Sequence, residues 1–486
     1  MTNLGNQVAR ATKWSVLSEL MAKLITPISM MVLARVLTPE AYGAIATTAI
    51  VISFAELFTD SGFPKYLIQH NFQSDEEKSE SANVAFWTNF SLSLFIWGII
   101  IIFRHQIAII VGSPELGNAI AVACIAIPIT TFSSIQIALF KRDLNFQPLF
   151  HARIVGIVTP FLFTIPLAMW LKNYWALIVG TIFYQVVTAI ILAINSKWHP
   201  RRYYSFGKLK EMLAFCFWII TNDVLTYFTG YIDLFLISQK FDQHKLGIYR
   251  TAVSTSTQII ALVSAIVLPV LLPVYSKIQS DHNKLRETML KIQKYLGIII
   301  LPLGFGVFLY SDLVTNLLLG PQWAEAAPII GLWGILHSFS LLINRNCSNT
   351  YIAIGRPKIS VLLQTLYAAA LIPTIIISSN ISFEAVYYTR AFAKGWMIVL
   401  NLITIYITIR QSTIKVITNI LPELWGCIVM SGAALLLSFL GNNTQWQLVS
   451  ILICGIVYFA TICIFKEDRQ ALSNIIRYAK QQIQVK

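Results

Sequence analysis

The chain has 486 residues, of which 56% are hydrophobic and only 12% are charged, and its mean hydropathy is +0.67. A water-soluble protein of this length could not bury so much apolar surface, so the composition excludes a soluble globular protein and indicates a membrane protein. The formal net charge of +14 does not indicate nucleic-acid binding, because the basic residues follow a membrane-topology pattern.

Long apolar runs follow one another along the whole chain. Each run is long enough, at about 1.5 Å per residue, to cross about 30 Å of hydrocarbon as a helix. The first run follows Arg10 and Lys13 and is too long for a signal peptide, so we expect it to be retained. The fold class is therefore predicted as all-α, a polytopic membrane protein with about 14 transmembrane helices. The predicted spans are 14–37, 41–64, 81–103, 117–140, 148–171, 173–195, 211–238, 247–275, 293–310, 325–350, 358–378, 384–409, 420–440 and 446–465.

Lys and Arg residues alternate from one gap between runs to the next. Alternate gaps hold few of them, while the other gaps and both ends of the chain hold most of the rest, as in the loop with Lys197, Arg201 and Arg202. Since basic loops stay on the cytoplasmic side, both termini are predicted to be cytoplasmic. The sparse, outward-facing set is Arg35, Arg104, Lys172, Lys240, Lys245 and Arg250.

Two hairpin sequences resemble each other and suggest an internal repeat. Leu33–Gly43 and Ile237–Gly247 both place a short polar loop ending in glycine between two long helices. A repeat of six spans gives two parallel lobes with a site between them, as in many transporters. The predicted domains are an N-terminal lobe over 1–206, a C-terminal lobe over 207–412, and accessory spans with an amphipathic tail over 413–486. That tail has Leu472, Ile475, Ile476, Ala479 and Ile483 on one helical face and is expected to lie on the inner leaflet.

Catalytic signatures such as G-x-G-x-x-G, G-x-S-x-G, H-E-x-x-H and the P-loop are missing from the sequence, and no Cys/His cluster indicates a metal site. We expect no enzymatic activity, no cofactor and no metal. Charge inside the runs is then the main indication of function, because an ionised side chain at the bilayer centre costs about 2.5–3.5 kcal/mol.

The candidate cations of the membrane interior are Lys23 in the first span, Arg345 near the inner part of the tenth span, and Arg390 with Lys394 in the twelfth. Arg390 and Lys394 are four residues apart, so they share one helix face, where two like charges favour a shared anion. Arg donates two parallel hydrogen bonds to phosphate or carboxylate and Lys supplies a point charge, so this set is the predicted substrate-binding site. Arg345 could also snorkel to the inner surface.

Acidic residues inside the spans are candidates for coupling transport to H⁺ or Na⁺. They are Glu56, Asp60, Asp223 and Asp233. Other roles stay open for some of them, because Asp60 could reach the inner surface and Asp233 could cap a neighbouring helix end. Glu19, one turn before Lys23, could neutralise that lysine.

Short patches from the first to the eleventh span resemble the Wzx-type polysaccharide flippases of the multidrug/oligosaccharidyl-lipid/polysaccharide exporter superfamily. The stretch from Val32 to Gly43 and the stretch from Phe58 to Gln69 carry this resemblance, as do Asp233 and three further patches. The three patches are Leu246-Gly-Ile-Tyr249, Leu319-Gly-Pro-Gln-Trp323-Ala-Glu-Ala and Ile354-Gly-Arg-Pro-Lys358.

The resemblance implies two six-helix lobes with two extra helices. It also implies alternating access that carries an undecaprenyl-diphosphate-linked oligosaccharide to the outer face of the bacterial cytoplasmic (inner) membrane. Family members have a positively charged central cavity, and Lys23, Arg345, Arg390 and Lys394 are the candidates here by position. Asp60 and Asp233 fall within matching patches. The implied partners are the lipid-linked substrate, membrane lipids and polysaccharide polymerases, with no nucleic acid.

Three rival functions stay open. A flippase for a peptidoglycan precursor would share the headgroup chemistry. A multidrug exporter of the same fold would need a cavity dominated by acids and aromatic residues. A membrane glycosyl polymerase or ligase would need catalytic residues on a large outer loop, and the outer loops here are short.

Overall fold

The structure is a computed structural model, and it describes Trp14 and residues 21–59, 62–70, 72–278, 281–356 and 358–474. These residues form helices, turns and loops, and no strand occurs among them. The predicted all-α class is thus confirmed. The described chain divides into two compact units, the first drawn from 1–250 and 375–386 and the second from 251–374 and 387–486.

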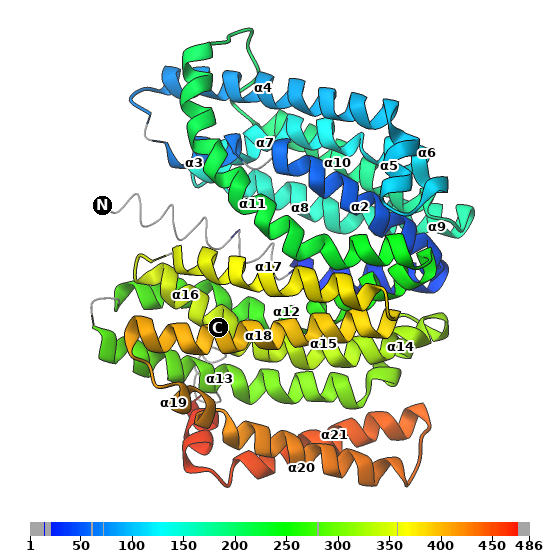
Figure 1. The fold of residues 1–486 in the computed structure, drawn as a ribbon, viewed down its shortest axis with the longest axis vertical. Coiled ribbons are helices and arrows are strands. Elements are labelled where there is room, and N and C mark those ends of the chain that lie inside the picture. Colours follow the sequence, from blue (N-terminus) through cyan, green and yellow to red (C-terminus); the bar gives the residue numbers. More distant parts are fainter. Residues whose placement is uncertain are drawn as a thin grey trace. The chain divides into compact units, whose positions relative to one another are not determined.

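The first unit opens with helical residues 21–36 and continues through ten helices in chain order, which Figure 1 draws from blue to green. Within it α4 packs on α7, α10 packs on α7 and α8, and α11 packs on α2. Its elements are α2 (Pro39–Thr59), α3 (Phe63–Gln69), α4 (Asp75–Ile102), α5 (Arg104–Ile110), η1 (Pro114–Leu116), α6 (Gly117–Ala123), α7 (Ala126–Arg142), α8 (Gln147–Thr159), η2 (Pro160–Thr164), α9 (Ile165–Leu171), α10 (Trp175–Asn195), α11 (Phe206–Lys240) and the first turns of α12 (Gln243–Lys277).

The second unit contains the rest of α12 and the C-terminal helices. Here α13 packs on α15 and α20, and α20 and α21 form an antiparallel hairpin (Figure 1). Its elements are α13 (His282–Leu309), α14 (Ser311–Leu318), η3 (Pro321–Ala326), α15 (Ala327–Phe339), η4 (Ser340–Arg345), α16 (Asn346–Ala353), most of α17 (Lys358–Ser379) and α18 (Phe383–Ile409), α19 (Thr413–Thr418), α20 (Leu421–Ser438), α21 (Thr444–Ile462) and helical residues 466–474.

Polar side chains begin several of these helices by binding backbone amides that have no partner within the helix. Ser74 accepts a hydrogen bond from the Glu77 amide at 3.1 Å, while Glu77 accepts one from the Gln73 amide at 2.6 Å. Ser74 is thus the N-cap of α4, and Glu77 binds the amide of the residue before the cap. Asp281 and Asn443 are the N-caps of α13 and α21, each through a side-chain oxygen that accepts from backbone amides of the first turn. Loop sequence therefore sets where the long helices begin.

Eleven of the described helices are long and apolar enough to cross a membrane. They coincide with all predicted spans except 14–37, 211–238 and 247–275. Those three coincide with helical residues 21–36, with α11 and with α12, the last two each of 35 residues. The total of fourteen spans stays a prediction, and so do the lobe boundaries at 206 and 412.

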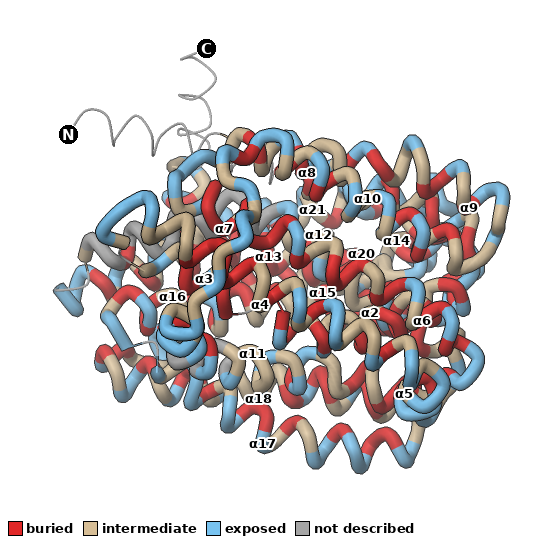
Figure 2. The backbone as a smooth tube through the Cα atoms, turned by 90° about the horizontal axis from the view of Figure 1, so that it is seen from above, coloured by how far each residue is buried: buried red, intermediate tan, exposed pale blue. Residues whose placement is uncertain are grey.

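The helix surfaces fit a hydrocarbon solvent. Buried and exposed residues alternate along the helices in Figure 2, and the exposed side includes large apolar groups such as Phe392, Trp170 and Phe439, at 81%, 80% and 86% exposure. Because helices satisfy their own backbone hydrogen bonds, such faces are stable in lipid. The chain is a multi-pass membrane protein. In the predicted tail face only Leu472 is described, and Ile475, Ile476, Ala479 and Ile483 lie outside the described residues.

Candidate functional site

A stripe of polar residues runs along α18 in the second unit. Arg390, Lys394 and Asn401 follow an i, i+4, i+11 spacing, which places them on one helix face. The exposed fraction is only 8% for Arg390 and 1% for Asn401, and Lys394 is half-buried. The structure thus keeps the two predicted cations together on a largely buried face.

A matching stripe faces it from α15 and η4. Trp333, His337 and Asn344 repeat the same spacing. The Lys394 Nζ lies 4.8 Å from the centroid of the buried Trp333 ring, and the Asn401 Nδ2 donates to the Asn344 Oδ1 at 3.2 Å. The two stripes therefore contact each other at two positions, one contact being cation–π and the other a hydrogen bond.

Two further contacts extend this polar layer to neighbouring helices. The Arg390 guanidinium lies 6.0 Å from the centroid of the Tyr367 ring on α17. A ring nitrogen of His337, Nε2, lies 3.0 Å from the Thr257 hydroxyl on α12. Aromatic faces thus stabilise both cations of this face by cation–π contacts.

A π-helical turn interrupts the helix between the two stripe contacts. The segment η4 follows Phe339 and ends at Arg345, whose side chain is exposed. A π-turn widens the helix locally and is common at functional sites. The Asn344 amide on η4 thus contacts Asn401 of α18, and Arg345 is the next residue along the chain.

The four predicted cations do not all lie in one unit. Arg345, Arg390 and Lys394 belong to the second unit, whereas Lys23 is half-buried on helical residues 21–36 of the first. We call the set of Arg390, Lys394, Trp333, His337 and Asn344 the cationic layer.

The predicted acids have different surroundings. Asp233 is 4% exposed and its Oδ2 accepts a hydrogen bond from the Tyr249 hydroxyl at 2.6 Å. Asp223 pairs with the Lys65 Nζ at 2.8 Å, and that lysine side chain is 49% exposed. Glu56 is half-buried on α2. Asp60 lies outside the described residues, as does Glu19.

Sequence reasoning missed Trp333, His337, Asn344, Asn401 and Thr257. A signal for most of them is present in the sequence, because polar residues recur at i+4 and i+11 in two apolar runs. The spacing alone does not show which two apolar runs pack against each other.

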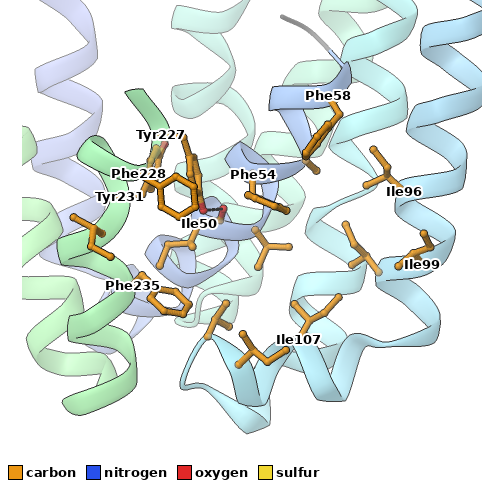
Figure 3. Close-up of a pocket in the computed structure, with 16 residues that line it drawn as sticks. Ile50, Phe54, Phe58, Ile96, Ile99, Ile107, Tyr227, Phe228, Tyr231 and Phe235 are labelled. Carbon is orange, nitrogen blue, oxygen red and sulfur yellow. Dashed lines mark hydrogen bonds between the residues drawn. The ribbon is translucent and has the colours of Figure 1, made fainter. Parts of the chain in front are cut away.

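An apolar pocket of about 510 Å³ lies in the first unit, between α2, α4, α5 and α11. Figure 3 shows Phe54, Tyr227, Tyr231 and Phe235 around it, with the Tyr227 hydroxyl turned to the carbonyl of Ile50 at 3.0 Å. The Tyr231 hydroxyl lies 2.7 Å from the Ser53 hydroxyl. Because both phenols bind protein groups, the aromatic faces rather than the hydroxyls form the wall, and the pocket suits a hydrocarbon chain.

Sequence relatives carry names from polysaccharide export. The succinoglycan biosynthesis transport protein ExoT of Rhizobium meliloti is 22% identical over 490 residues, covering 97% of this chain and 96% of the relative. The lipopolysaccharide biosynthesis protein WzxC of Escherichia coli is 21% identical and covers 78% of this chain and 77% of its own length.

Solved membrane transporters share the fold. The lipid II flippase MurJ, in an inward closed conformation, superposes with a TM-score of 0.72 at 17% identity, over 95% of this chain and 99% of that one. An inward-facing multidrug transporter of the MATE family gives 0.61 at 14% identity, over 81% of this chain and 97% of the other. At such low identity these likenesses concern the fold alone.

A family model described as polysaccharide biosynthesis protein matches residues 32–328, which is more than half of the chain. The resemblance to the Wzx-type polysaccharide flippases is confirmed by this match and by the named relatives. The chain belongs to the polysaccharide biosynthesis protein family.

Proposed function

We propose that this protein is a flippase that carries an undecaprenyl-diphosphate-linked oligosaccharide, the repeat unit of a surface polysaccharide, across the bacterial cytoplasmic membrane. The observation that supports this proposal most is the cationic layer, in which Arg390 and Lys394 share one largely buried helix face. A diphosphate diester has two negative charges, and these two side chains supply two positive ones. Arg345 and Lys23 would add to the positive lining.

The cargo also has a hydrocarbon part, for which the apolar pocket is suited. We assign the pocket lined by Phe54, Tyr231 and Phe235 to one segment of the cargo's lipid chain, the rest staying in the bilayer. The sugar-phosphate headgroup would pass between the lobes by alternating access, with both termini cytoplasmic. The protein would carry out no catalytic step, although it could work beside a polysaccharide polymerase.

Energy for outward transport has two sources in this proposal. A cytoplasm-negative potential favours outward movement of an anion by about 2.3 kcal/mol per charge per 100 mV. Glu56, Asp60, Asp223 and Asp233 are the proposed groups for coupling to H⁺ or Na⁺.

The test uses a strain that lacks the gene and is complemented with Arg390→Met plus Lys394→Met, which removes both charges and leaves unbranched, uncharged side chains. Surface polysaccharide should be lost and its lipid-linked precursor should accumulate, at a normal level of the protein in the membrane. Lys284→Met, an exposed lysine at the start of α13, is the matched control and should retain export. Full export by the double variant would remove the cationic layer from the site.

Two rival cargoes predict other outcomes in the same strain. Accumulation of a peptidoglycan precursor, with arrested growth, would favour that lipid as cargo. Sensitivity to cationic drugs without any change in lipid-linked glycans would favour a multidrug exporter.

A further inference from the structure

A second buried ionic cluster lies away from the cationic layer, where α13, α20 and helical residues 466–474 meet. Lys294 is 6% exposed, and Glu423 and Asp468 are both 0% exposed. The Lys294 Nζ is 2.8 Å from the Asp468 Oδ1 and 3.4 Å from the Glu423 Oε2. The cluster thus joins three helices that are far apart in sequence.

Lys294 binds the cluster through its ammonium group. The Nζ donates to the backbone oxygen of Asn419 at 3.0 Å and to the Glu423 Oε2 at 3.4 Å, and its contact with the Asp468 Oδ1 is an ion pair. The Glu423 Oε1 and both carboxylate oxygens of Asp468, all buried, have no hydrogen-bond partner among the described residues. Three carboxylate oxygens in the cluster therefore lack a hydrogen-bond donor.

The neighbouring side chains that the structure describes do not supply this donor. The Tyr458 hydroxyl on α21 donates to the Ile298 carbonyl at 3.2 Å, and the Asn419 side-chain amide donates to Leu290 and Gln293 oxygens. Gly297, one turn after Lys294, has no side chain, and a Cβ there would lie 3.3 Å from the Glu423 Oε1.

The charge count leads to the same conclusion. One ammonium and two carboxylates carry a net charge of −1 when all are ionised. Among the described residues, the other ionisable groups that interact electrostatically with these carboxyls are Cys427 on α20 and Tyr458 on α21, and a thiol and a phenol are ordinarily neutral at pH 7. A net charge buried away from water is strongly unfavourable, whereas one added proton makes the cluster neutral and supplies a hydrogen-bond donor.

We propose that Lys294, Glu423 and Asp468 form a proton-binding site that clamps the C-terminal helix onto α13 and α20. The proton is held among the buried oxygens of Glu423 and Asp468 that lack a donor within the described part of the chain. With the proton bound, the cluster is neutral and residues 466–474 stay docked. When the proton leaves, the buried charge is uncompensated and the helix that carries Asp468 is released towards water. In the predicted topology this end faces the cytoplasm, so cytoplasmic pH sets the state of the clamp.

The experiment measures mobility of the C-terminal helix in the full-length protein. A spin label is placed at Ser473→Cys, an exposed position, in a Cys463→Ser background, because the other five cysteines are buried. The line shapes of the electron paramagnetic resonance spectrum are recorded between about pH 5 and about pH 9. This range includes the pKa values that buried carboxyl groups reach in proteins. The mobile fraction should rise with pH.

Isosteric variants separate the proton from the packing. Glu423→Gln and, independently, Asp468→Asn each remove one negative charge without changing shape, so the label should stay immobile at every pH. Glu467→Gln, on the exposed side of the same helix, is the matched control and should titrate like the unchanged protein. An immobile label throughout the range in the unchanged protein, or an unaltered titration in both Glu423→Gln and Asp468→Asn, would overturn the proposal.

Discussion

Gly43 and Gly247, which end the two similar hairpins, lie against each other in the first unit. A Cβ atom on Gly247 would lie 2.9 Å from the Gly43 amide nitrogen and would overlap the Pro39 carbonyl oxygen. A Cβ atom on Gly43 would overlap the carbonyl oxygen of Gln243. These two glycines therefore allow the first turns of α2 and α12 to cross at backbone contact distance.

Alanine at either glycine should prevent this crossing. Because the obstructing atoms belong to the backbone and cannot rotate away, Gly43→Ala or Gly247→Ala should destabilise the protein by about 1–3 kcal/mol. Thermal unfolding in detergent measures the effect. Gly98→Ala on α4 is the control, since no described atom lies within 4 Å of its added Cβ. Equal stability of all three variants would contradict the crossing.

Charge in the cationic layer can be separated from hydrogen-bond geometry. Lys394→Arg keeps a cation near Trp333 and should retain part of the transport, whereas Lys394→Met should lose about tenfold or more, since a charge-assisted contact contributes about 1.5–3 kcal/mol. Transport is measured with fluorescent lipid-linked glycan in vesicles, at equal amounts of folded protein. Equal rates in both variants would show that the charge at this position is not used.

The Asp233–Tyr249 hydrogen bond should contribute to stability. Tyr249→Phe removes the donor from a buried carboxyl group and should cost about 1–3 kcal/mol of unfolding free energy. Tyr388→Phe, on an exposed ring at 57%, is the control and should change stability little. If Tyr249→Phe left stability unchanged but abolished the dependence of transport on an ion gradient, Asp233 would be a coupling group and not a structural one.

A larger side chain on one of the lining residues should reduce the volume of the apolar pocket. Ile96→Trp on α4 should displace two or three methylene groups of a bound chain, at about 0.8 kcal/mol each, and should weaken chain binding by about tenfold or more. Labelling of α2 and α11 by a lipid-linked glycan with a photoreactive group in its chain measures this. Leu94→Trp, on an exposed position of the same helix, should leave labelling intact. Equal labelling by an ordinary phospholipid analogue would assign the pocket to bilayer lipid.

The all-α class and most span positions could be predicted from the sequence, because a bilayer forces each apolar run to form a helix independently of the rest of the chain. About 20 apolar residues with internally satisfied backbone groups must form a helix, whichever helices surround them. Arg390 and Lys394 could be assigned to one helix face in the same way, because residues four apart lie on the same side of any α-helix.

Contacts between helices could not be predicted from the sequence, because they depend on which helices pack together. Lys294 reads as one more basic residue of a cytoplasmic loop, and neither Glu423 nor Asp468 stands out, yet the three meet in a buried cluster. Trp333 likewise looks like an ordinary apolar residue until α18 is placed beside it.

By itself, therefore, the sequence determined an all-α membrane protein with ionic residues inside its apolar runs, because both properties depend on short-range periodicity and on lipid as solvent. Only the tertiary structure decided which ionic groups meet aromatic rings, which meet opposite charge, and where an apolar pocket opens. Those outcomes depend on side chains from distant helices, whose pairing is set by packing and leaves no local trace.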